Sequence, residues 1–198
     1  MKDNIIGVNL DLEDSNESED EYILKNENGE AITSYYVEWN ETTALISYET
    51  NKKYRNQGYA SYGLNILKNE LFTKRQALIL ELINLSCDYS IKVAENAGFF
   101  SPSNSIDYYV TINPFAEEII ERKLRECQSD SKNYRQLQRL LERIKSLKKA
   151  QRTSMDKMQE KLNSLKKDAE LTDDEKFKER LMDEIAHLEG IVNQGRDI

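Results

Sequence analysis

Runs rich in apolar, aromatic and β-branched residues predict short strands in the first half of the chain. Residues 21–25 and 31–39 are two such runs, and they flank Asn28-Gly29, a dipeptide typical of tight hairpin turns. A third β-rich run at 43–48 follows after a short polar segment. We expect these three runs to form an antiparallel meander.

From Ala60 onward the apolar positions recur at helical spacing instead, as far as Phe72. Residues 77–83 are apolar except for Glu81, which is the pattern of a buried central strand. The acidic run 11–21 has neither period and is expected to be a solvated loop. In order, the expected elements are strands at 5–10, 21–25, 31–39 and 43–48, a helix at 60–72, a strand at 77–83, a helix at 88–98 and a strand at 108–112. This order indicates an α/β fold.

Heptad spacing dominates the last part of the chain. With Cys127 set as position a, ten of the thirteen a and d positions up to Ala169 are apolar, Tyr or Cys, as in a coiled coil. Thr172 then begins a capping-box sequence, and Gly190 is a typical helix C-terminal signal. We therefore expect an α-helical coiled-coil hairpin with helices at about 114–127, 131–167 and 172–190.

Composition changes near Pro114, so we divide the chain into a domain at 1–113 and a helical extension at 114–198. Residues 120–167 carry 15 basic and 6 acidic residues, whereas 168–198 are acidic. The hairpin would therefore pair a basic outgoing helix with an acidic returning helix. Binding of nucleic acid by the basic run is not favoured, because the apolar stripe interrupts the basic residues.

The returning helix is expected to be about half as long as the outgoing one. It cannot cover Leu137, Leu141 and Ile144, which therefore need another surface. We interpret this stripe as a homodimer interface, and docking on the chain's own domain is the alternative.

A single histidine, His187, and two cysteines exclude multi-His and paired-Cys zinc sites, so no metal is expected. No run of about 18 apolar residues is present, so no membrane span is expected. The first residues lack the profile of a secretory signal. A cytoplasmic protein with reduced thiols is the default expectation.

The segment 54–61, between the expected strand at 43–48 and the first helix, is the strongest candidate for chemistry. A strand that passes through a glycine turn into a helix points unpaired N–H groups at one place, and this suits a phosphate. Gly58 has no Cβ to block a close approach, and Lys52, Lys53 and Arg55 add positive charge. An ordinary strand–helix connection is the alternative.

Two motifs resemble a known family. Arg55-x-x-Gly58-x-Ala60 resembles the Arg/Gln-x-x-Gly-x-Gly/Ala signature of the GNAT family of N-acetyltransferases. The segment from Ser90 to Phe99 is similar to the Ser-x-x-Val-x-x-x-x-Gly-Phe motif of the branch that acetylates ribosomal-protein N-termini and polyamines. The motifs occur in the family's order, and the resemblance covers about residues 20–113.

The resemblance implies a GNAT-like mixed sheet, an acetyl-CoA site and direct attack of an amine on the thioester. Backbone amides of residues 57–61 would hold the pyrophosphate, and the backbone of residues 48–50 would pair with the pantetheine arm. The implied cofactor residues are Tyr48, Thr50, Arg55, Asn56, Gln57, Gly58, Tyr59, Ala60, Ser61, Cys87 and Ser90.

The chain departs from the family pattern around the reacting groups. Ala94 stands where many relatives have a Tyr that protonates the leaving thiolate, so Ser90 is the candidate acid. Glu49 and Glu81, on neighbouring expected strands, are the candidate bases. Cys87 replaces an Asn of this branch and is expected to be a buried small residue. The two acceptor-site helices that the family inserts between its first two strands are also missing.

Two functions of different class follow. The first is an acetyl-CoA-dependent N-acetyltransferase that acts on a small-molecule or protein amine and is dimerised by its coil. The alternative is a non-catalytic CoA-binding or scaffold protein whose coil binds a partner. The intact loop at 55–61 favours the enzyme, whereas Ala94 and the missing helices favour the alternative.

Overall fold

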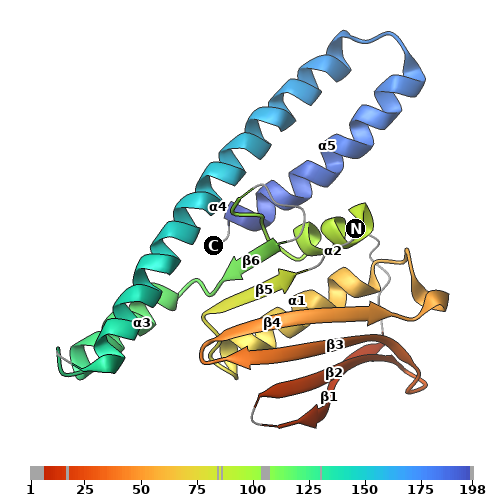
Figure 1. The fold of residues 1–198 in the computed structure, drawn as a ribbon. Helices are drawn as coiled ribbons and strands as arrows, with labels where there is room; N and C mark the ends of the chain where they lie inside the picture. Colours follow the sequence, from red (N-terminus) through yellow and green to blue (C-terminus); the bar gives the residue numbers. More distant parts are fainter. Residues whose placement is uncertain are drawn as a thin grey trace.

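In a computed structural model the chain forms a six-stranded mixed sheet followed by a long helical hairpin, which confirms the expected fold class (Figure 1). The structure describes residues 7–16, 18–83, 85, 87–103, 108–129 and 131–196. The strands lie in the sheet in chain order. They are β1 (Val8–Ser15), β2 (Glu19–Asn26), β3 (Ala31–Asn40), β4 (Thr43–Thr50), β5 (Ile79–Ile83) and β6 (Tyr108–Ile112). The helices are the short 3-10 helix η1 (Lys52–Tyr54), α1 (Tyr59–Thr73), α2 (Asp88–Asn96), α3 (Ala116–Glu126), α4 (Lys132–Leu171) and α5 (Glu175–Arg196).

The acidic run 11–21 is not a loop, contrary to the expectation from its composition. It forms most of the β1–β2 hairpin, and β2 begins only four residues after β1 ends. β1 is an edge strand whose side chains mostly face solvent, so its sequence needs no apolar alternation. Ile5 and Ile6, at the start of the expected strand 5–10, lie outside the described residues.

Asp20 is the buried exception in this acidic hairpin, with 2% of its surface exposed. Its carboxylate accepts hydrogen bonds from Trp39 Nε1 at 2.8 Å and from the Arg75 guanidinium at 2.6 Å. A buried carboxylate is tolerated because these donors replace its hydration. The contacts fix the first hairpin against β3 and against the end of α1.

β4 has different partners on its two sides. β3 pairs with it in antiparallel fashion along its whole length, as far as Thr50. β5 pairs with it in parallel only as far as Ile46 and Leu82. Residues 47–50 therefore diverge from β5 and have no partner in it.

Helices α1 and α2 cover one face of the sheet. Leu64, Leu67 and Leu71, the apolar positions that predicted α1, have no exposed surface and pack in the first core. Ala94 of α2 is buried in the same core. These contacts hold both helix N-termini next to the divergence of β4 and β5.

Helix α3 and the first half of α4 cover the other face at β5 and β6. Ile120 of α3 and Ile144 of α4 are fully buried in a second core with Ile79 of β5. Leu137 and Leu141 pack partly buried against this core. The stripe that we interpreted as a dimer interface therefore has a partner within the chain, although homodimerisation itself stays a prediction.

Helix α5 returns along the far half of α4, and the resulting hairpin projects away from the sheet (Figure 1). Leu162 of α4 is buried with apolar residues of α5. The pairs Lys161–Glu184 (2.7 Å) and Lys166–Glu189 (2.6 Å) join the two helices. The basic helix and the acidic helix are thus antiparallel neighbours, as their charges predicted.

The helix ends differ from the predicted ones. α4 continues to Leu171, and α5 begins at Glu175 because the Asp174 carboxylate accepts two backbone amides of its first turn. Gly190 does not end α5, which continues to Arg196.

The division at residues 113 and 114 stays a prediction, and the second core contains residues from both sides of it.

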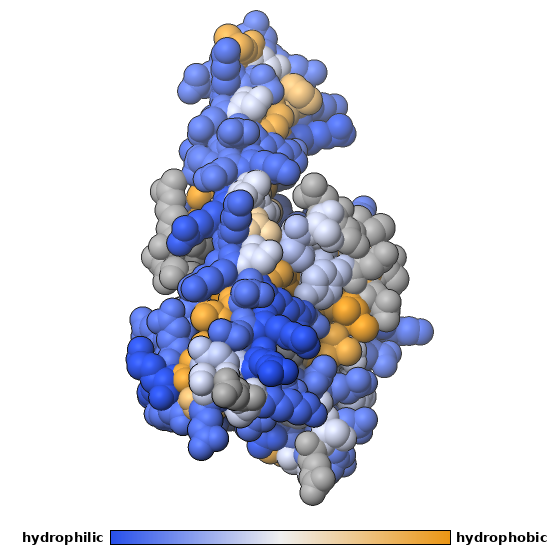
Figure 2. All heavy atoms as spheres, turned by 60° about the vertical axis from the view of Figure 1, so that its left-hand side comes forward, coloured by the Kyte–Doolittle hydropathy of each residue, from blue (hydrophilic) through white to orange (hydrophobic). Residues whose placement is uncertain are grey.

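The surface of the hairpin is mostly hydrophilic, with apolar atoms near its tip (Figure 2). The large apolar side chains exposed in this part of the chain are Leu171, Phe177 and Met182. Within the described residues, no helix combines the length and the apolar character needed to cross a bilayer.

Candidate active site

The N-terminus of α1 has the geometry expected of an anion site. Gly58 precedes the helix with φ of 87°, and Asn56 has φ of 65°. These left-handed residues turn the chain sharply from the loop into the helix. The first-turn amides of residues 59–61 have no partners within the helix, because such amides point out of its end.

The position of this helix end is set by Tyr35 of β3. The Tyr35 hydroxyl donates to the backbone oxygen of Ala60 at 2.9 Å. Gly63 makes room for it, since a Cβ at that position would lie 2.3 Å from the Tyr35 oxygen. The helix N-terminus is therefore held directly against the sheet.

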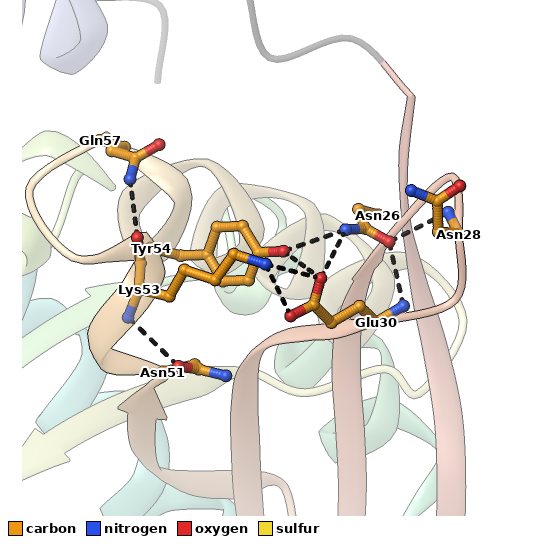
Figure 3. A network of polar contacts seen from close by, with 7 residues as sticks. All are labelled: Asn26, Asn28, Glu30, Asn51, Lys53, Tyr54 and Gln57. Atoms are coloured by element: carbon orange, nitrogen blue, oxygen red, sulfur yellow. Dashed lines mark hydrogen bonds and ion pairs between the residues drawn. The ribbon is translucent and has the colours of Figure 1, made fainter.

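A polar network holds the preceding loop to the β2–β3 turn (Figure 3). Glu30 accepts a hydrogen bond from the Tyr54 hydroxyl at 2.5 Å and pairs with Lys53 Nζ at 3.0 Å. The Asn26 amide donates to the Tyr54 oxygen at 3.1 Å. Glu30 therefore neutralises Lys53, one of the three cations expected to attract a phosphate.

The positive charge of Arg55 lies at the cleft that extends past the N-terminus of α1. Its Nε donates to the backbone oxygen of Thr50 at 3.0 Å, which joins the loop to the divergent end of β4. Gln57 behaves differently, because its side-chain amide donates back to the Lys53 oxygen at 3.0 Å.

A cleft of about 530 Å³ extends past the N-terminus of α1, the end of β4 and the N-terminus of α2. Ten of the eleven implied cofactor residues line this cofactor cleft, and Gln57 is the one that does not. The candidate base Glu49 lines it as well. Sequence reasoning missed Tyr54, Tyr89, Lys92, Val93 and Asn96, which complete the lining.

Lys92 is the most informative of the missed residues. It is exposed on α2, lines the cofactor cleft, and supplies a second positive charge there besides Arg55. Its place within the Ser90–Phe99 motif, two residues after Ser90, was the available signal.

Cys87 and Ser90 lie at the N-terminus of α2, with Cys87 Sγ and Ser90 Oγ 3.3 Å apart. Cys87 is exposed, so the expectation of a buried residue was wrong. The chain leaves the sheet before α2 begins, and its N-cap residue therefore faces the cofactor cleft instead of the core. The Ser90 hydroxyl and backbone N–H lower the pKa of the Cys87 thiol.

The Tyr48 side chain crosses from β4 toward α2. Its hydroxyl donates to the backbone oxygen of Ser90 at 3.5 Å, and burial raises its pKa to about 12. The sequence implicated only the Tyr48 backbone, because strand periodicity does not show what a side chain meets across a sheet. Ala94 has no exposed surface, so the position of the family's Tyr faces the core.

A second cleft, of about 350 Å³, lies between the divergent ends of β4 and β5. Tyr48 and Ser90 line both clefts, so the two spaces meet at these side chains. Glu81 lines neither of them; its carboxylate accepts from the Tyr108 hydroxyl at 2.8 Å and pairs with Arg143 of α4. Of the two candidate bases, only Glu49 is therefore next to the cofactor cleft.

No family model and no curated protein matches the sequence. Among solved structures, the chain is similar to a ribosomal-protein-S5-alanine acetyltransferase from Vibrio fischeri. The TM-score is 0.42 at 12% identity, with 48% of this chain and 62% of that one covered. This chain thus spans less than two thirds of that structure's length.

The chain is also similar to the spermidine N-acetyltransferase from Vibrio cholerae solved with CoA and spermine. The TM-score is 0.44 at 13% identity, over 49% of this chain and 67% of that one. A dodecameric structure of the same kind of enzyme gives a TM-score of 0.44 at 13% identity, over 50% and 68%. Solved acetyltransferases are therefore among the structures that part of this chain resembles.

Proposed function

We propose that this chain is an acetyl-CoA-dependent N-acetyltransferase that transfers an acetyl group to an amine. One observation carries the proposal: a single cleft joins a glycine-preceded helix N-terminus, the divergent end of a strand and a second helix N-terminus. The motifs that resemble the GNAT family lie in the loop at 55–60 and in α2, which are two of these three parts.

The residues of the cofactor cleft fit a CoA thioester. First-turn amides of α1, together with Arg55 and Lys92, would hold the pyrophosphate, because amides and fixed cations replace its hydration. The residues of β4 beyond Ile46 have no β5 partner and would bind the pantetheine arm. Tyr48 and Ser90 line the same cleft.

Bound acetyl-CoA would supply an acetyl group activated as a thioester. The Tyr48 hydroxyl is protonated at neutral pH, as an ordinary tyrosine is, and burial raises its pKa further, to about 12. It can donate to the leaving sulfur. Ser90 is the second donor at this position. Glu49 is the candidate base of the cofactor cleft, whereas Arg143 and Tyr108 stabilise Glu81 as a bound carboxylate. Holding the two reactants in adjoining clefts would provide the proximity on which direct transfer depends.

A CoA-binding protein without catalysis is the second candidate. The buried Ala94 favours it, because no hydroxyl projects from the position of the family's usual acid. The two candidates differ in turnover only: both predict CoA binding, and only the enzyme releases free thiol in the presence of an amine.

Thermal unfolding with CoA and with acetyl-CoA tests cofactor binding. At about 100 times Kd, a ligand stabilises a protein by about 2.7 kcal/mol, which corresponds to about 5–10 °C here. Gly58→Asp and Lys92→Glu place negative charge at the phosphate end and should remove this shift. Gly190→Asp is the matched control, since nothing lies within 4 Å of a Cβ added there. No stabilisation of the unmodified chain by either ligand would overturn the proposal.

Homodimerisation remains a separate expectation. The packing of Leu137, Leu141 and Ile144 on the chain's own core removes the need for a second subunit at that stripe. Light scattering on the full chain decides the matter, and a monomer mass over the whole accessible concentration range would exclude the dimer.

A further inference from the structure

Basic side chains gather on the first part of α4. Residues 132–152 contain eight basic residues and one acidic residue, Glu142, which gives a net charge of +7. Arg143 and Lys148 are already balanced by ion pairs with glutamates of the sheet and of α3. The other six form the basic face of α4. They are exposed, and no described residue forms an ion pair with Lys132, Arg135, Arg139, Lys145, Lys149 or Arg152.

The basic face lies on the side of α4 that points away from the cores. Its members form two rows, 132, 135 and 139 in one and 145, 149 and 152 in the other, because residues three, four and seven apart share a side of a helix. Ile144 and Leu147 of the apolar stripe are buried in the second core on the opposite side. The stripe interrupts the basic residues along the sequence, which is why the sequence does not favour nucleic-acid binding. In the folded helix it does not separate them.

Most carboxylates of the chain lie away from the basic face. The acidic β1–β2 hairpin forms the edge of the sheet opposite β6, which contacts α4. Five strand spacings separate β1 from β6, or about 24 Å, which exceeds two Debye lengths at physiological salt. The acidic helix α5 packs against α4 from Met155 onward. α3 carries four glutamates and three cations, so it lowers the local charge by one unit only.

The shape and polarity of the basic face suit a DNA duplex. α4 runs along the outer edge of the molecule (Figure 1), and residues 132–152 extend over about 30 Å, close to one turn of B-DNA. The major groove of B-DNA admits an α-helix, whereas that of duplex RNA is deep and narrow. Among residues 132–152 no large apolar side chain is exposed. A helix that binds a membrane surface instead presents an apolar face to the lipid.

We infer that α4 binds double-stranded DNA through its basic face, without reading the base sequence. The helix would lie along the major groove, and the two rows of cations would contact phosphates on its two sides. Such contacts release counterions from the DNA, so binding weakens steeply with salt. The inference goes beyond the proposed function, because none of the described residues that line the cofactor cleft belongs to α4.

Fluorescence anisotropy of a labelled DNA duplex of about 20 base pairs tests the inference with the full chain. We expect a Kd of about 10⁻⁶–10⁻⁴ M at physiological salt. Six phosphate contacts predict a slope of about −5 for the logarithm of the binding constant against that of the salt concentration. No binding at low salt would overturn the inference. Equal or tighter binding of duplex RNA of the same sequence, or of phosphatidylserine vesicles, would also overturn it.

Two triple variants with the same change in net charge locate the binding surface. The first removes three lysines of the basic face: Lys132→Gln, Lys145→Gln and Lys149→Gln. The second removes three exposed lysines elsewhere on the hairpin: Lys157→Gln, Lys167→Gln and Lys176→Gln. The first should weaken DNA binding at least about tenfold and make the salt slope shallower by about 3, whereas the second should leave both nearly unchanged. Equal losses in the two variants would refute the assignment to the basic face.

A change that strengthens binding guards against misfolding as an explanation. Glu142 is the single carboxylate among the cations of residues 132–152, so Glu142→Lys should tighten DNA binding and steepen its salt slope by about 1. Glu160→Lys, on the same side of α4 five turns later, is the matched control. Weaker or unchanged binding by Glu142→Lys would contradict the inference.

Thermal unfolding with CoA separates this inference from the proposed function. The shift caused by CoA should be the same in all four variants, because none of the substituted residues lines the cofactor cleft. DNA binding by a chain that CoA does not stabilise would overturn the acetyltransferase and leave the basic face in place. Stabilisation by CoA without DNA binding would do the reverse.

Discussion

Truncation of Ile144 to alanine tests whether α4 belongs to the core of the sheet. The Ile144 side chain is fully buried in the second core. The change removes three buried carbons, which at about 0.8 kcal/mol each is a transfer loss of about 2.4 kcal/mol. The remaining cavity raises the expected loss to about 3–4 kcal/mol. This is a large part of the free energy of unfolding of a typical domain, about 5–15 kcal/mol.

Unfolding in urea can be followed by the fluorescence of Trp39, the only tryptophan. This signal reports the loss of stability at a position distant from Ile144. Trp39 lies on β3 and packs with the first core, on the opposite side of the sheet from α4. A fall in the stability reported by Trp39 would therefore mean that α4 and the sheet unfold together. Lys145→Ala, at the exposed neighbouring position, is the control.

A particular result would refute this reasoning. If Ile144→Ala lowered the urea midpoint of helix unfolding and left the Trp39 midpoint unchanged, residues 114–198 would be an independent unit. The shared second core would then contribute little to the stability of the sheet. The parts of the chain before and after the division at residues 113 and 114 would unfold independently of each other.

Three further predictions concern the site and its surroundings. Tyr48→Phe should lower kcat about tenfold or more without changing the Kd of CoA, as measured by single-turnover kinetics and calorimetry. Cys87 should react with iodoacetamide faster than Cys127, because hydrogen bonds lower the pKa of the Cys87 thiol. Bound CoA should protect Cys87 from this reaction. Equal reaction rates of the two cysteines, measured by mass spectrometry, would contradict the prediction. Burial raises the pKa of Glu95, so the folded chain holds this proton more tightly than the unfolded chain and loses stability as pH rises through the acid range. Glu95→Gln should therefore gain stability relative to the unmodified chain as the pH rises above about 4.3, the ordinary pKa of a glutamate. The gain, measured as Tm, is expected even though His187 lies 3.7 Å from the carboxylate.

The order of the strands and helices was predictable because each has a clear period or turn signal. Asn28-Gly29 marks the β2–β3 turn, and Leu64, Leu67 and Leu71 mark the buried stripe of α1. In both cases the local pattern and the packing in the fold agree, so the sequence alone is sufficient.

The acidic hairpin was missed because β1 is an edge strand with most of its side chains in solvent, so it carries no apolar alternation. β1 is held by its backbone pairing with β2, which composition does not reveal. Asp20 shows the same limit, since an acidic residue in an acidic run gives no sign that Trp39 and Arg75 will bury it.

The helical tail shows what a heptad pattern can and cannot determine. Ile144 and Leu162 both belong to the a and d stripe, yet Ile144 packs on the sheet and Leu162 on α5. A helix presents the same stripe to a sheet, to a neighbouring helix and to a second subunit. The period therefore predicted an apolar stripe, while the partner of each part of it depended on the apolar faces of β5, β6 and α5.

The same distinction explains why cofactor positions were easier to predict than reacting groups. A phosphate site made of backbone amides needs a strand, a glycine with positive φ and a helix, all of which are local features around Gly58. The reacting groups instead come from separate elements that meet only in the fold: Tyr48 and Glu49 from β4 and Ser90 from α2. Glu81 has the same local pattern as a candidate base, but Arg143, 62 residues later in the chain, occupies its carboxylate. Side-chain chemistry at such a junction is determined by tertiary contacts, so mutation of Tyr48 and Glu49 is more informative here than further inspection of the motifs.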